Sequence, residues 1–223
     1  MNRIVWRLDR RGERWPSQPK PEPGAPEPGG YSVLPGTYRV RLTYGPHTDS
    51  ASVMVKSDPR STISQQDMEA NYAMLEQLLA RVHTATDAAD RLREAKKRME
   101  QIAGLIKERT DSTAKKVKDL GTALQDTIKK LDEMIDDREV QGIRNDPSLL
   151  QSKLQQASSY VTTTWDAPGE SQRIAVAQAV ESLKKLADAV NRFFETDWSK
   201  YEGAVDAAKI RFFEPYVPIK VDQ

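Results

Sequence analysis

The side chains best suited to chemistry in this sequence are two histidines and a large number of carboxylates. His47 falls in a predicted turn and His83 in a predicted helix, and neither has the H-E-x-x-H spacing or a second histidine on its face that a metal site needs. One group of acids closes a predicted helix, where the helix dipole disfavours negative charge: Asp132, Glu133, Asp136, Asp137 and Glu139. Acids on a helix surface provide no cleft that would fix two carboxylates for glycoside hydrolysis. The sequence therefore predicts no catalytic residue, no metal site and no cofactor.

Overall composition excludes further classes of protein. The 223 residues include no cysteine, which excludes disulfides, thiolate zinc sites and a cysteine nucleophile. The 34 basic and 33 acidic residues nearly cancel, so there is no broad positive field for binding nucleic acid. No apolar run approaches the ~20 residues of a membrane helix, and the first eight residues do not resemble a signal peptide.

Aromatic side chains gather toward the two ends of the chain. We expect those of the first 60 residues to pack against those of the last quarter, because large rings are buried together in cores. A sharper alternative is an aromatic surface that binds a glycan or a peptide. The candidate interaction residues for that alternative are Trp15, Tyr31 and Trp198.

The elements that must position these residues divide the chain near residue 60. Residues 1–60 contain a Pro/Gly-rich loop over 15–36, which proline geometry excludes from helices. Alternating apolar residues predict strands over 2–9, 37–44 and 51–55, with Tyr38, Val40, Leu42 and Tyr44 facing inward. Three strands are marginal alone, so we expect a small Ig-like antiparallel β unit that docks onto something else.

Residues 61–211 carry helical apolar stripes instead, and 212–223 form a C-terminal tail. Ser64, Asp111 and Asp146 are predicted helix caps, and Asp197 is a further candidate for a last short helix. The first stripe slips in register near Thr84 and Thr86, which would distort a coiled coil locally. Short connections favour a long antiparallel bundle of three to four helices, so the predicted fold class is α+β.

Several segments resemble the C-terminal region of bacterial sortilin-like or BNR/Asp-box repeat propeller proteins, which are often labelled glycosyl hydrolases. The most specific are the strand opening Pro35-Gly36-Thr37-Tyr38 and the junction Asp58-Pro59-Arg60. Further similar segments are 2–8, 34–42, 53–60, 147–154 and 196–198. The Asp-box pattern S-x-D-x-G-x-x-W does not occur, so the resemblance implies that a propeller would be a separate piece and that no catalytic residue carries over.

The resemblance implies a non-catalytic accessory or interaction module of an extracytoplasmic protein, with a β-propeller domain or another protein as its partner. A glycan- or peptide-binding module that uses aromatics of residues 1–60 is the alternative. A hydrolase is a third class, which would require the chemistry to lie in this chain. The sequence leaves the oligomeric state open.

Overall fold

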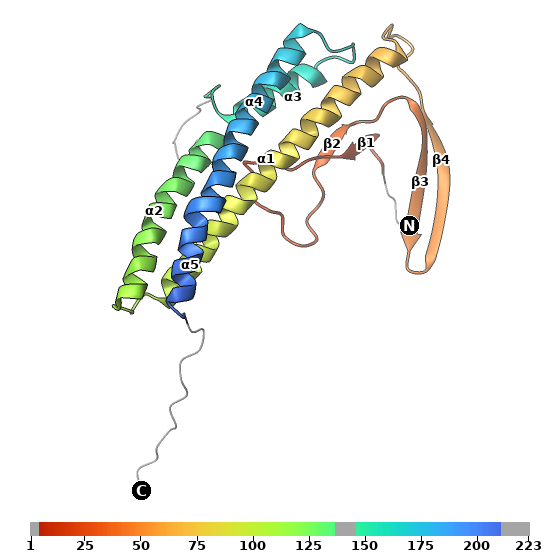
Figure 1. Ribbon diagram of the computed structural model, residues 1–223. Coiled ribbons are helices and arrows are strands. Elements are labelled where there is room, and N and C mark those ends of the chain that lie inside the picture. The colour runs from red at the N-terminus through yellow and green to blue at the C-terminus, as the bar shows by residue number, and fades with distance from the viewer. Residues whose placement is uncertain (1–4, 137–145, 211–223) are drawn as a thin grey trace.

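The computed structural model describes residues 5–136 and 146–210, and its two small sheets and long helices confirm the predicted α+β class (Figure 1). The strands are β1 (Asp9–Arg11), β2 (Gly29–Ser32), β3 (Gly36–Tyr44) and β4 (His47–Val55). The helices are α1 (Gln65–Leu105), α2 (Ser112–Ile135), α3 (Leu150–Thr162), α4 (Glu170–Arg192), the π-helix η1 (Phe193–Trp198) and α5 (Ser199–Ala207).

Helix α1 is a single uninterrupted helix of 41 residues. Ser64 caps its first turn by accepting a hydrogen bond from the backbone N–H of Asp67 at 3.1 Å, as predicted. The helix continues through the register slip near Thr84 and Thr86 without a break. The residues at the slip are small, and the segment that contains Arg14 packs against them. The slip therefore marks the place where this segment contacts α1 and not an end of the helix.

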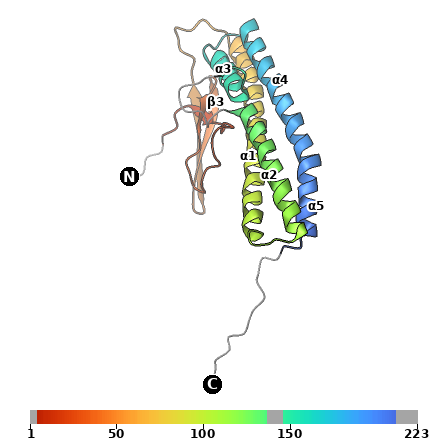
Figure 2. The same cartoon turned by 90° about the vertical axis from the view of Figure 1, so that its left-hand side faces the viewer.

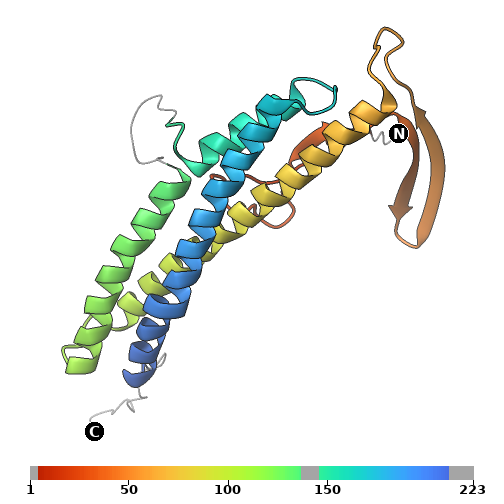
Figure 3. The ribbon, with the colours of Figure 1, turned by 45° about the horizontal axis from the view of Figure 1, so that its top comes forward.

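The other helices lie in two rows beside α1 (Figures 1 and 3). One row consists of α2 followed by α3, and the other is the continuous run of α4, η1 and α5. Contacts of α1 with α2, α3 and α4, and of α3 with α4 and α2 with α5, join the three rows. The core between them is aliphatic along most of its length, with Leu78, Leu92, Leu154 and Leu186 fully buried.

Two predicted caps are wrong. Asp146 does not cap a helix: its carboxylate accepts from the backbone N–H of Ser148 at 2.8 Å, and α3 begins four residues later at Leu150. Asp197 does not start a separate helix, because α4 runs into η1 and α5 without a turn. The wider π-helical turn lets Phe193 and Trp198 both reach the core, so the chain keeps its helical course there.

The described part of residues 1–60 does not form one Ig-like unit. It forms two separate two-stranded antiparallel sheets, β1 with β2 and β3 with β4. The predicted strand over 2–9 is also wrong where it can be checked, since residues 5–8 are not strand; residues 2–4 lie outside the described residues. Strand β2 falls inside the predicted Pro/Gly-rich loop, and Gly30 allows its close approach to β1, because a Cβ there would lie 2.1 Å from the carbonyl oxygen of Arg10.

Among residues 5–136 and 146–210, no pair of aromatic rings joins the first 60 residues to the last quarter of the chain. Trp6 packs on Tyr38 near the N-terminus, with ring centroids 5.4 Å apart. Phe193, Phe194, Trp198 and Tyr201 form their own cluster within the helices. Phe212, Phe213 and Tyr216, like the predicted tail 212–223, lie outside the described residues.

Candidate functional site

The most exposed ordered element is the hairpin formed by β3 and β4, here called the hairpin (residues 36–55). Its two-residue loop is Gly45-Pro46, and Gly45 has φ +56°, a conformation that glycine adopts without strain. All nine residues of each strand pair without a bulge, from Gly36 opposite Val55 to Tyr44 opposite His47. The result is a regular ribbon that stands apart from the helices (Figures 1 and 2).

The two faces of the hairpin differ in chemistry. Residues that pair across an antiparallel ladder share a face, so the register places Val40 with Ala51 and Tyr38 with Val53. Leu42 and Tyr44 continue this face toward the turn, where their cross-strand partners are the polar residues Asp49 and His47. The opposite face carries two arginines, small hydroxyl residues and, near the base, one exposed methionine: Thr37, Arg39, Arg41, Thr43, Thr48, Ser50, Ser52 and Met54.

The apolar face is open to solvent. Leu42 is 54% exposed and Tyr44 83% exposed, and Val40 and Val53 are also classed among the exposed apolar residues. Sequence alternation predicted these side chains to face inward, and that prediction is wrong. Among the described helices and strands, β3 and β4 contact only each other, so no second layer covers the face.

The base of the hairpin, in contrast, is fixed to the N-terminal segment. Tyr38 donates a hydrogen bond from its hydroxyl to the carbonyl of Leu34 at 2.6 Å, and its ring packs against Trp6. Trp6 in turn donates from its indole N–H to the carbonyl of Asp9 at 2.8 Å. The adjoining Val33 is buried. One end of the hairpin is therefore anchored, and the end that carries Leu42 and Tyr44 projects.

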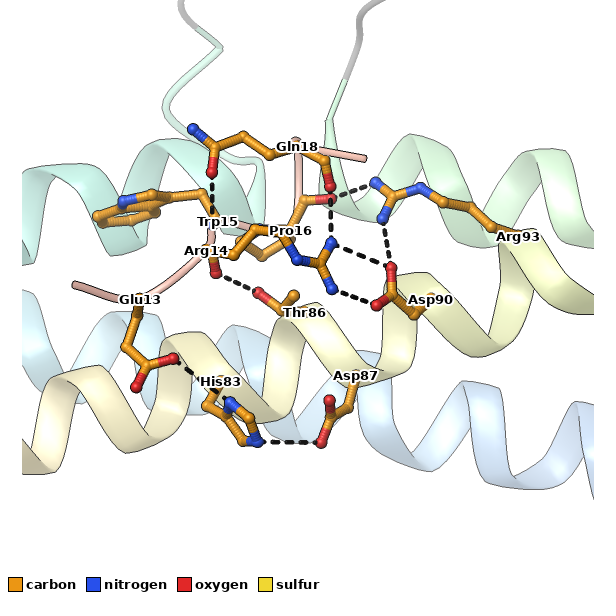
Figure 4. A network of polar contacts seen from close by, with 10 residues as sticks. All are labelled: Glu13, Arg14, Trp15, Pro16, Gln18, His83, Thr86, Asp87, Asp90 and Arg93. Carbon is orange, nitrogen blue, oxygen red and sulfur yellow. Dashed lines mark hydrogen bonds and ion pairs between the residues drawn. The ribbon is translucent and has the colours of Figure 1, made fainter. Parts of the chain in front are cut away.

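A second feature is the segment of residues 12–18, which we call the strap; it ends in a turn in which the N–H of Gln18 donates to the carbonyl of Trp15 at 2.9 Å. It crosses α1 at the level where α2 and α3 lie to either side (Figure 4). Trp15 packs against the helical core and Pro16 is fully buried. Thr86 of α1 donates a hydrogen bond to the carbonyl of Arg14 at 2.7 Å. The strap thus adds Trp15 and Pro16 to the helical core and is hydrogen-bonded to α1.

An ion-pair network fastens the strap to α1. Arg14 forms a two-pronged contact with the carboxylate of Asp90, and Arg93 donates to the same carboxylate at 2.8 Å (Figure 4). Arg93 also donates to the carbonyl of Pro16. Burial alone would raise the pKa of Asp90, but the hydrogen bonds from Arg14 and Arg93 hold that pKa below its ordinary value.

The two histidines take different positions. His83 lies between two carboxylates, with Nδ1 3.4 Å from Glu13 of the strap and Nε2 3.5 Å from Asp87 of α1 (Figure 4). His47 lies at the tip of the hairpin, opposite Tyr44. Within residues 5–136 and 146–210, no group of three histidine, aspartate or glutamate side chains is arranged to hold a metal ion.

The three interaction residues expected from the sequence lie apart and make internal contacts. Trp15 belongs to the strap, and the Tyr31 hydroxyl lies 2.5 Å from that of Ser158 on α3. Trp198 is only 8% exposed and donates from its indole N–H to Glu202 at 2.7 Å. The structure does not bring these three rings together.

The exposed residues Leu42 and Tyr44 were assigned to the core by sequence reasoning. The signal that could have identified them is the mismatch between a long alternating hairpin and the absence of further strands to cover it.

Asp137 and Glu139, the last acids of the predicted cluster, lie outside the described residues. In the described part of the chain, no helix is long and apolar enough to cross a membrane.

Comparison with protein-family models, with curated proteins and with solved structures gave no match.

Proposed function

We propose that this chain is a non-catalytic accessory module that binds another protein through the apolar face of its hairpin. The expected partner is a β-propeller domain of the sortilin-like or Asp-box class, outside the cytoplasm. The observation that carries the proposal is the exposure of Val40, Leu42, Tyr44 and Val53 on one face of an ordered ribbon. The fold of the helices does not use this face.

The size of this face supports a binding role. Nine residues at ~3.4 Å and two strands at ~4.8 Å give roughly 300 Å² as an upper limit for the apolar area, because His47 and Asp49 also lie on this face. Contiguous apolar patches of that order on ordered proteins are often binding sites. Tyr44, at the tip and 83% exposed, has the amphipathic ring that commonly dominates the energy of protein interfaces.

The anchoring of the hairpin also supports the proposal. Trp6 and Leu34 hold Tyr38 at the base, and the strap fixes the N-terminal segment to α1 through Arg14 and Asp90. A surface that is already ordered loses less conformational entropy when it binds. The helices therefore serve as a rigid stem that presents the hairpin.

Binding of the purified chain to a purified propeller domain of the sortilin-like or Asp-box class tests the proposal. We expect the Leu42→Lys variant to bind at least about tenfold more weakly, because docking would bury its charge against apolar groups. Isothermal titration calorimetry measures the dissociation constants. The change should leave the fold intact, since Leu42 is 54% exposed.

Ile174→Lys is the matched control, because Ile174 is an apolar residue of α4 with 49% exposure. It should bind as the unaltered chain does. Lack of binding by the unaltered chain would overturn the choice of a propeller as partner. Equal binding by the Leu42→Lys variant would overturn the choice of the hairpin as the surface.

A further inference from the structure

Strand β4 has an open edge on which one charged residue, Asp49, is the only protective feature. Exposed edge strands are usually shielded by lysine, proline, a bulge or a covering element. Among its nine residues β4 has no lysine and no proline, and its register with β3 has no bulge. No other described strand pairs with it, and it is the strand of the hairpin farther from α1 in Figures 1 and 3.

The edge of β3 is different in charge. Arg39 and Arg41 lie on β3, and neither has a hydrogen bond or ion pair with another described residue. In an antiparallel pairing of two β3 strands centred on Val40, Arg39 of one chain would lie opposite Arg41 of the other. Like charges directly opposite each other destabilise a ladder, so β3 is poorly suited to pair with its own copy.

We propose that β4 pairs antiparallel with β4 of a second copy of this chain, which joins two hairpins into a four-stranded sheet. In the pairing centred on Ser52, Ala51 lies opposite Val53 of the second copy, and Ser50 lies opposite its Met54. No like charges meet, because Asp49 is the only charged residue of β4 and it lies opposite Val55. The apolar faces of both hairpins become one continuous surface of at most roughly 600 Å².

Backbone geometry identifies the residues that face the open edge. A two-residue hairpin loop is closed by a hydrogen-bonded pair, here Tyr44 and His47, and such pairs alternate along the ladder. Thr48, Ser50, Ser52 and Met54 therefore direct their backbone groups away from β3. Ser52 lies at the centre of this pairing. The N–H of Ser50 donates to the Asp49 carboxylate at 2.7 Å and would exchange that bond for one to Met54 of the second copy.

Two small sheets also gain stability by joining. A two-stranded hairpin is marginal in water, whereas three or more strands with an apolar face form a stable sheet. The buried area remains below the ~1,200 Å² of tight interfaces, so we expect reversible dimers. The inference goes beyond the proposed function and does not depend on a propeller, because the pairing leaves the apolar face open for a partner.

The test is the mass of the purified chain by sedimentation equilibrium, from about 1 µM to about 1 mM. We expect a rise from 25.2 kDa to twice that value. Ser52→Pro should remain at the mass of one chain, since it removes the outward N–H without removing a β3–β4 hydrogen bond. Arg39→Pro is the matched control, because Arg39 lies directly opposite Ser52 and faces the other edge. It should still dimerise.

A cross-linking experiment tests the same pairing without introducing proline. The chain has no cysteine, so a single Ser52→Cys change allows only symmetric disulfides between copies. A hydrogen-bonded antiparallel pair has a Cα–Cα separation of about 5.5 Å, which suits a disulfide. We expect Ser52→Cys to form covalent dimers on oxidation and Thr43→Cys, on the β3 edge, to do so at least about tenfold more slowly.

A constant mass of one chain across the concentration range would overturn the inference. So would dimers of the Ser52→Pro variant, or equal cross-linking at positions 52 and 43. Loss of dimers in both proline variants would mean that the hairpin itself had been disrupted, and the cysteine pair would then decide. Binding to a propeller domain is measured separately, so either proposal can fail while the other stands.

Discussion

Asp90 is the residue on which attachment of the strap depends most. It accepts hydrogen bonds from Arg14 on the strap and from Arg93 on its own helix, and Arg93 also reaches the carbonyl of Pro16. The side chain of Arg14 is only 19% exposed and that of Asp90 28% exposed, so solvent screens the pair less than an ion pair in open water. The Asp90 carboxylate thus fixes the side chains of both arginines, and these two residues in turn fix the strap backbone on either side of Trp15.

Acid should release the strap. The pKa of Asp90 is lowered in the folded chain, so its contribution to stability is complete above the ordinary value of 3.8 and is lost as the pH falls through the lower folded value. Fluorine NMR of fluorotryptophan-labelled protein should show the Trp15 signal moving toward that of an exposed ring in this range. In the Asp90→Asn variant this acid transition should be absent; an unchanged transition would assign it to another group.

Loss of the Asp90 side chain should also destabilise the fold at neutral pH. Asp90→Ala leaves Arg14 and Arg93 without their charged acceptor in a partly buried site. We expect the free energy of unfolding to fall by about 1–3 kcal/mol, the usual cost of removing one partner of a charged hydrogen bond. Urea unfolding followed by far-ultraviolet circular dichroism measures it. Glu94→Ala, which removes an exposed ion pair with Arg98, should change stability by less than about 1 kcal/mol.

Residue-level features were predictable when they were local. The caps Ser64 and Asp111 follow from side chains that bond to backbone groups three residues away. The contact of Arg14 with Asp90 spans 76 residues, and no short-range pattern encodes it. Trp15 was noticed as an aromatic residue, but its place in the core depends on how α2 and α3 are arranged around α1.

At the scale of elements, the helices follow from the period of their apolar residues. Leu124 and Leu183 recur with that period and are 4% and 5% exposed. The first turns of α4 do not follow the apolar period as closely: Ile174 is 49% exposed, whereas Ala175 and Ala179 face the core. Small residues carry a weak hydrophobic signal, so the apolar period does not identify the buried face there.

Truncation of these core leucines should be costly. We expect Leu124→Ala and Leu183→Ala each to lower the free energy of unfolding by about 2–5 kcal/mol, since each leaves a cavity among packed helices. Ile174→Ala is the control and should change stability by no more than about 0.5 kcal/mol, because its side chain is half exposed. Thermal unfolding compares the three. Unchanged melting temperatures in both leucine variants would contradict the packing.

The strands show the limit of the sequence pattern at this scale. Alternation indicated the two strands of the hairpin, but His47, which was predicted to lie in the turn, begins β4, and alternation also indicated that one face would be buried. Alternation reports that an apolar face exists and does not report what covers it. The hairpin of residues 36–55 was therefore predictable as an element, and its exposure was not.

The whole molecule divides its apolar residues between two uses. The helices and the strap bury theirs together, while the hairpin keeps one apolar face in water and is anchored only at its base. The helices and the strap form the stem, and the hairpin is the surface that projects from it (Figure 1). The fold class was accessible from the sequence, because it needs only the two periodicities. The placement of the hairpin outside the core could not be predicted from the sequence, because it depends on the hairpin making no contact with the described helices.

The most direct test of this division is the stability of a chain in which residues 36–55 are replaced by a short Gly/Ser linker. Urea unfolding, followed through the helical circular dichroism signal, gives the free energy of unfolding of the stem. We expect a change of no more than about 0.5 kcal/mol, as for surface positions that make no core contact. A loss of several kcal/mol would contradict the account, because it would make the hairpin a structural support for the helices and not a surface kept for a partner.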